Sequence, residues 1–128
     1  MTEGKKMSKC YHKLKLYVDS RMDEEHFFKS IFILALLQHN NRNIKKIIKN
    51  NFIKYCKKIL NETDIYKIYK ETKESLFKDG VINEDGELVL CAPYENFDNL
   101  TDYEIYDLIE FCEEKIEQYL KERSIVAA

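Results

Sequence analysis

Glycine and proline are scarce in this sequence of 128 residues, and each shortage excludes a class of protein. Only three glycines occur, too few for a glycine-rich loop around a nucleotide phosphate, and no known nucleophile motif is present. We therefore predict a protein that is not an enzyme of a familiar type and that uses no cofactor. The single proline and the 45% of apolar residues are typical of a helical globular protein rather than a disordered chain.

Long apolar runs are also missing. The longest, residues 27–37, includes Lys29 and Ser30 and is far shorter than the ~20 residues that cross a bilayer. Residues 1–6 contain no apolar core of a secretion signal. We expect an intracellular, cytoplasmic protein with no membrane contact.

The four cysteines are widely separated, so neither a zinc-knuckle spacing nor a dithiol redox motif occurs. Their neighbours are apolar, which predicts buried free thiols rather than disulfides. Cys10 and His12 would point in different directions on a helix, so we predict no metal site there.

Hydrophobic spacing predicts a mainly all-α protein, a five-helix bundle in a single domain of residues 1–128. Residues 1–6 are expected to be flexible and 124–128 frayed. The expected helices cover residues 7–18, 21–39, 42–60, 65–78 and 102–120. Because residues 27–37 are apolar on nearly every side, the second helix should lie at the centre.

Polar residues mark the expected helix ends. Ser20 is the predicted N-cap of the second helix, and Asn41 that of the third. Thr101 and Glu104 form the pattern of a capping box at the start of the last helix. Residues 81–90 are predicted to form a short β-hairpin, with Asp85 and Gly86 as a two-residue turn of positive φ.

The last helix carries a seam of apolar residues with a period of 3.5: Ile105, Ile109, Cys112, Ile116 and Tyr119. Two arrangements would satisfy this seam. The helix could dock on the rest of the bundle, or residues 105–119 could form an antiparallel homodimer contact.

Charge is divided unevenly along the chain. Residues 1–78 contain 18 Lys/Arg and 9 Asp/Glu, a balance of +9, whereas residues 79–128 contain 3 and 14, a balance of −11. The two balances give the net charge of −2. Either half could attract the other, or each could attract an outside partner.

Our first hypothesis is a non-enzymatic regulatory or inhibitory protein that binds another protein through its acidic C-terminal half. A nucleic-acid-handling protein with a basic groove is the partner that this charge favours. A small charged protein without catalytic motifs is also typical of inhibitors encoded by viruses or mobile elements. Aromatic anchors and carboxylates define the expected contact surface: Tyr94, Phe97, Tyr103, Glu104, Tyr106, Asp107, Glu110, Phe111, Glu113 and Glu114.

The alternative is nucleic-acid binding through the basic helix 42–60. Its exposed positions hold cations and no acid: Arg42, Lys45, Lys46, Lys49, Lys54, Lys57 and Lys58. Lysines outnumber arginines 18 to 3, which disfavours the reading of base edges. A winged-helix arrangement, with the hairpin as the wing, would place Glu84, Asp85 and Glu87 against phosphate.

A second alternative comes from the segment between Arg21 and His26. It resembles the R-x4–6-H motif of the helical ribonucleases of the HEPN type. The resemblance implies that Arg21 and His26 would act on the 2′-hydroxyl and phosphate of RNA. Met22 stands where that family usually has a polar residue after the arginine.

Overall fold

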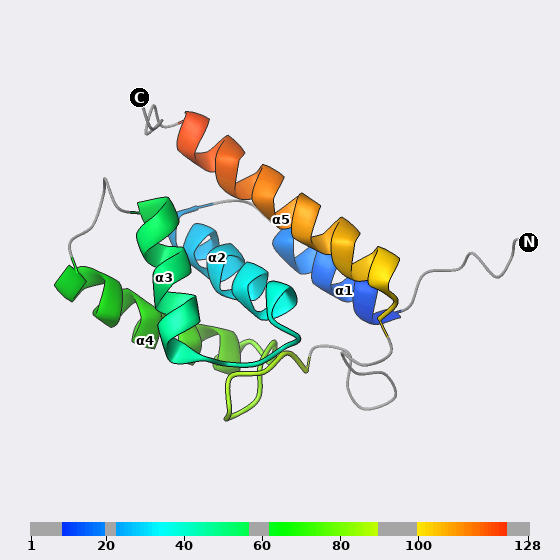
Figure 1. Ribbon diagram of the computed structural model, residues 1–128, viewed down its shortest axis with the longest axis horizontal. Helices are drawn as coiled ribbons and strands as arrows, with labels where there is room; N and C mark the ends of the chain where they lie inside the picture. The colour runs from blue at the N-terminus through cyan, green and yellow to red at the C-terminus, as the bar shows by residue number, and fades with distance from the viewer. Residues whose placement is uncertain (1–8, 20–22, 57–61, 90–99, 123–128) are drawn as a thin grey trace, which may run out of the picture.

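The computed structural model describes residues 9–19, 23–56, 62–89 and 100–122, and these residues form a mostly helical fold. Five helices lie in them: α1 (Lys9–Val18), α2 (Glu24–Gln38), α3 (Lys45–Cys56), α4 (Glu62–Lys78) and α5 (Asp102–Glu122). In Figure 1, α5 runs beside α1 on one side of α2, while α3 and α4 lie on the other side. The predicted all-α bundle is confirmed.

The central position predicted for the second helix is also confirmed. Every residue from His26 to Leu37 is buried, and α2 packs against α3, α4 and α5. Phe27 stacks on Tyr119 of α5 with ring centroids 4.2 Å apart, and Phe32 stacks on Tyr69 of α4 at 5.6 Å. Each fully buried large side chain contributes about 1.5–3 kcal/mol to folding, so α2 anchors the core.

The ends of α2 differ from the prediction. Its N-cap is Asp23 and not the predicted Ser20. The Asp23 carboxylate accepts a hydrogen bond of 2.8 Å from the backbone N–H of His26. Ser20 lies outside the described residues. At the other end Asn40 and Asn41 have φ of 57° and 60°, a left-handed conformation that asparagine tolerates.

Asn41 does not cap α3, which begins four residues later at Lys45. Instead its side chain accepts a hydrogen bond of 2.6 Å from the N–H of Leu88 and donates one of 3.3 Å to the Leu88 carbonyl. Asn41, which was expected to start a helix, therefore holds the segment after α4 against the segment between α2 and α3.

The predicted β-hairpin at residues 81–90 is wrong for the part that the structure describes, residues 81–89. No strand forms there; a single antiparallel bridge joins Ile82 to Leu88. The loop is longer than two residues, because the N–H of Asn83 bonds to the Glu87 carbonyl and only Gly86 has positive φ. The Asn83 side chain supplies the turn instead, by accepting bonds from the N–H groups of Asp85 and Glu87. A two-stranded wing is therefore not present in these residues.

The capping box of α5 is confirmed. The Thr101 hydroxyl accepts a bond of 3.1 Å from the Glu104 N–H, and the Glu104 carboxylate accepts one of 2.9 Å from the Thr101 N–H. From there the seam residues Cys112, Ile116 and Tyr119 are buried against the rest of the chain. The seam is used to dock α5 on the bundle. The seam therefore offers little apolar surface for the homodimer contact predicted as the alternative.

Ion pairs strengthen the contact between α1 and α5. Lys15 on α1 lies 3.1 Å from the Asp107 carboxylate, which also accepts a hydrogen bond from the Tyr11 hydroxyl. Lys115 on α5 lies 2.9 Å from the carboxylate of Asp19, just after α1. Across the described segments, none of the helices is both long and apolar enough to cross a bilayer.

Candidate functional site

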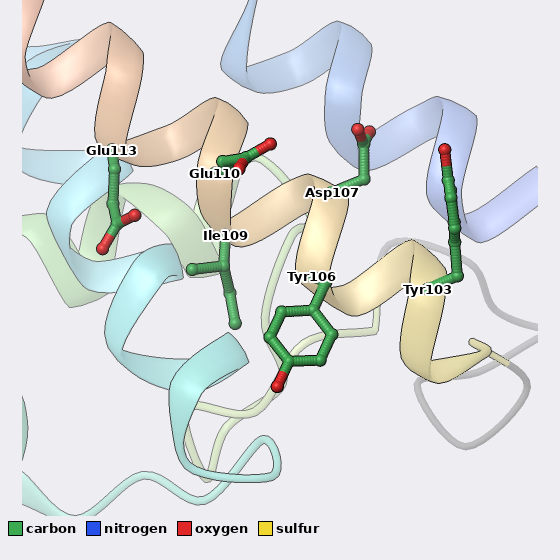
Figure 2. A pocket seen from close by; sticks show the side chains of 6 residues that line it. All are labelled: Tyr103, Tyr106, Asp107, Ile109, Glu110 and Glu113. Carbon is green, nitrogen blue, oxygen red and sulfur yellow. The ribbon is translucent and has the colours of Figure 1, made fainter.

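The outer side of α5 contains a hollow that unites several of the predicted protein-binding residues. Six side chains line it: Tyr103, Tyr106, Asp107, Ile109, Glu110 and Glu113. Figure 2 shows that all of them project from α5, with Tyr106 pointing away from Tyr103 and Asp107. We call this group the α5 hollow.

Helical spacing explains the arrangement. Tyr106, Glu110 and Glu113 follow one another at four and three residues, so they share one side of the helix. Ile109 is half-buried between this side and the core. The α5 hollow therefore has an apolar residue at its inner edge and carboxylates around it.

The two tyrosines of the hollow are exposed to an unusual degree for large aromatic residues. Tyr103 is 65% exposed and Tyr106 is 76% exposed. Neither ring is needed for the core, which α5 reaches through Leu108, Cys112 and Ile116. Both rings are free to contact another molecule.

Asp107 belongs to the hollow but is already paired. Its bonds from Tyr11 and Lys15 outweigh burial and lower the pKa of its carboxyl group. The same carboxylate raises the pKa of Tyr11, although burial raises it more. By contrast, Glu110 and Glu113 have no ion-pair partner among the described residues.

Other predicted contact residues lie elsewhere. Glu104 is only 3% exposed and serves the cap of α5, so its prediction as a surface contact is wrong. Phe111 is half-buried, with the ammonium groups of Lys15 and Lys115 at 5.0 and 5.7 Å from its ring centroid. Glu114 is exposed on α5, and Tyr94 and Phe97 lie outside the described residues.

The lysines of α3 are not neutralised by α5. In the described segments no ion pair joins Lys45, Lys46, Lys49 or Lys54 to a carboxylate of α5. The α5 carboxylates do influence Tyr55 near the C-terminal end of α3. Burial raises the pKa of Tyr55, and the negative charges of Glu113 and Glu117 raise it further. Arg42 is exposed before α3, while Lys57 and Lys58 lie outside the described residues.

Sequence analysis did not single out Tyr66 on α4. Its exposed ring lies among the ammonium groups of Lys45, Lys49 and Lys70, which belong to two helices. The only local signal is the four-residue spacing of Tyr66 and Lys70 on one side of α4. Lys45 and Lys49 join them only because α3 packs against α4.

The histidine of the ribonuclease-like motif is buried at the start of α2. The His26 ring is 8% exposed, its Nε2 lies 3.3 Å from the Val18 carbonyl, and its ring centroid is 5.3 Å from that of Tyr17. Arg21 lies outside the described residues. The chemical role of the pair stays a prediction.

Two thiols, Cys56 and Cys112, are free and buried, as the apolar neighbours of the cysteines predicted. Burial raises the pKa of each to about 12, so both remain protonated at neutral pH. Across the described ranges, no three His, Cys, Asp or Glu side chains are grouped closely enough to hold a metal ion.

Comparison of the chain with protein-family models, with curated proteins and with solved structures finds no match.

Proposed function

We propose that this protein is a non-enzymatic regulator that binds a basic surface of another protein through the α5 hollow. The observation that carries the proposal is the combination on one helix of two highly exposed tyrosines with Glu110 and Glu113, whose carboxylates have no ion-pair partner among the described residues. Tyrosine is a frequent anchor of protein interfaces because it buries a large ring at little entropic cost and keeps a polar hydroxyl.

The carboxylates give the proposed interface its preference for a partner. Glu110 and Glu113 line the hollow, and the exposed Glu114 and Glu117 continue the negative charge along α5. Such a surface attracts a positively charged protein and accelerates the encounter, an effect that salt weakens. A groove that binds nucleic acid has this positive charge, which makes a nucleic-acid-handling protein the favoured partner.

The rigid attachment of α5 supports the proposal. The helix is capped at its start and packed on α2 by its buried seam. Asp107 pairs it with Lys15 of α1, and Lys115 pairs it with Asp19 just after α1. An anchor on a rigid element loses little conformational entropy on binding. The hollow is therefore suited to recognition without rearrangement of the helix.

A matched pair of variants tests the proposal. One variant carries Tyr106→Ala, Glu110→Gln and Glu113→Gln on α5. The control carries Phe77→Ala, Glu71→Gln and Glu74→Gln on exposed positions of α4, and so loses one aromatic ring and two negative charges as well. Both are compared with the unmodified protein in affinity purification from cells that express it naturally, followed by mass spectrometry.

We expect a partner that the unmodified protein and the α4 control retain and that the α5 variant loses. Loss of an aromatic anchor costs about 2 kcal/mol, so a titration with the purified partner should show affinity reduced by about 30-fold. A partner held equally by all three proteins would contradict the proposal.

A further inference from the structure

Tyr66 on α4 is surrounded by positive charge. Its ring is 43% exposed, and the ammonium groups of Lys45, Lys49 and Lys70 lie 4.6, 5.2 and 5.8 Å from its centroid. Lys45 also lies within 3.5 Å of the Tyr66 hydroxyl. We call these four residues the Tyr66 cluster.

Two packed helices build the cluster. Lys45 and Lys49 are four residues apart on α3, and Tyr66 and Lys70 are four residues apart on α4, so each pair shares one helix face. A hollow beside the cluster is lined by Lys45, Tyr66, Lys70 and Lys73. Phe77, which is 51% exposed, and the carboxylates of Glu74 and Glu84 line the same hollow.

Within the part of the chain that the structure describes, no ion pair compensates the positive charge of the cluster. Among the described residues, none of the three lysines lies within ion-pair distance of a carboxylate. The hydrogen bond from Lys45, followed by the positive charge of the three lysines, lowers the pKa of Tyr66. Contact with one exposed ring offsets the mutual repulsion of the lysines only weakly, because a cation–π contact at an exposed site contributes about 0.5–1 kcal/mol. An anion at this position would be stabilised by all three.

We propose that the Tyr66 cluster binds single-stranded nucleic acid, with a base stacked on Tyr66 and the flanking phosphates on Lys45, Lys49 and Lys70. The combination of an exposed ring with surrounding cations is how proteins bind single strands without reading their sequence. A ring on the outer surface of a helix stacks on an unpaired base, whereas the bases of a duplex are already stacked on each other. Lysine binds phosphate as a point charge and reads base edges less well than arginine, so the site should tolerate any sequence.

The proposal is independent of the α5 hollow, because it uses other helices and the opposite charge. Its test is fluorescence anisotropy of the full chain with a labelled 15-mer of oligothymidine, over a series of salt concentrations. Three phosphate contacts predict a slope of log affinity against log salt of about −2. The variants are Tyr66→Ala, Tyr66→Phe and the double variant Lys45→Gln, Lys49→Gln.

We expect Tyr66→Ala to weaken binding by about 5- to 150-fold and Tyr66→Phe to keep most of it, since the flat ring and not the hydroxyl stacks on the base. Lys45→Gln with Lys49→Gln should reduce the magnitude of the salt slope by about 1.4. The control is Tyr103→Ala, which removes from α5 a tyrosine that is 65% exposed, more than the 43% of Tyr66, without changing charge, and should leave the affinity unchanged.

Two further ligands separate stacking from simple attraction of charge. An abasic strand of the same length should bind the unmodified protein and Tyr66→Ala equally, because it has phosphates but no bases. A duplex should bind more weakly than the single strand. The proposal is overturned by the absence of binding at low salt, by equal affinity for duplex and strand, or by unchanged binding of oligothymidine to Tyr66→Ala while its circular dichroism shows a native fold.

Discussion

Lys29 shows how a single residue in the interior determines the positions of three elements. It is 7% exposed in α2, and its ammonium group lies 2.8 Å from the Glu25 carboxylate and 3.0 Å from that of Asp79. The Tyr17 hydroxyl of α1 donates to the same Asp79 oxygen at 2.7 Å. Burial would lower the pKa of Lys29, but the bonds to both carboxylates outweigh it and raise the pKa. A charge can be buried here because it is paired, and the pairing connects α1, α2 and the residue after α4.

Gly80 and Gly86 provide a controlled comparison at the residue scale. Both have positive φ, of 77° and 85°, a conformation that costs other residues about 1–2 kcal/mol. A Cβ at Gly80 would meet no atom within 4 Å, whereas one at Gly86 would lie 2.2 Å from the Asn43 side-chain nitrogen. That nitrogen donates a hydrogen bond of 2.7 Å to the Asp85 carbonyl.

We therefore expect Gly80→Ala to reduce the free energy of unfolding by about 1 kcal/mol and Gly86→Ala to reduce it by about 2–3 kcal/mol. The larger loss combines backbone strain with displacement of Asn43. Urea unfolding followed by circular dichroism measures both values. Equal losses in the two variants would show that Asn43 moves aside without cost.

At the scale of the element, the start of α5 determines how firmly the α5 hollow is held. The capping box satisfies two backbone N–H donors, those of Thr101 and Glu104, and Tyr103 lies inside the same first turn. The α5 hollow begins with that turn. Loss of the cap should therefore affect the fold and the hollow together.

Thr101→Ala should lower the free energy of unfolding by about 1 kcal/mol, because the Glu104 N–H loses its partner. Thr101→Ser keeps the hydroxyl and should restore most of the stability. Glu114→Ala, an exposed change in the middle of α5, should alter it by less than about 0.5 kcal/mol and serves as the control. A Thr101→Ala variant as stable as Thr101→Ser would argue that the cap contributes nothing.

At the scale of the whole molecule, acid should destabilise the fold through three carboxylates. Hydrogen bonds from Lys29 and Ser75 lower the pKa of Glu25. Burial would raise the pKa of Asp79, but the bonds from Tyr17 and Lys29 lower it overall. The pKa of Asp107 is lowered in the same way by Tyr11 and Lys15.

A group with a lowered pKa in the folded state binds fewer protons there than in the unfolded chain. Its stabilisation is complete above the ordinary carboxyl pKa of about 4 and is lost as the pH falls through the folded value. We expect the contribution of these three carboxylates to the free energy of unfolding to be constant from pH 7 to about pH 5.5 and to decrease below it. Asp79→Asn should lose about 1–2 kcal/mol at pH 7 and show a shallower decrease in acid. An unchanged acid profile in Asp79→Asn would contradict the role given to this carboxylate.

The basic α3 and the acidic α5 keep their outer charges apart, because no ion pair joins the two helices in the described segments. The pairs between described residues lie between α1 and α5 or around Lys29, and none of them involves a lysine of α3 or the carboxylates of Glu110 and Glu113. This separation allows the α5 hollow and the Tyr66 cluster to be tested independently.

The sequence by itself determined the features that depend on neighbours three or four residues away. These include the five helices, the central position of α2 and the capping box of α5, because helical periodicity and capping are local. It also placed Tyr103, Tyr106, Glu110 and Glu113 on one helix, where the structure has them line a common hollow.

Only the tertiary structure decided which of these residues remain available to contact another molecule. Glu104 is buried, Asp107 is taken by Tyr11 and Lys15, and Asn41 binds Leu88 instead of capping α3. The Tyr66 cluster likewise needs α3 and α4 to pack together before its lysines meet. The physical reason is that contacts between residues distant in sequence depend on how whole helices pack, and spacing within one helix carries no information about that.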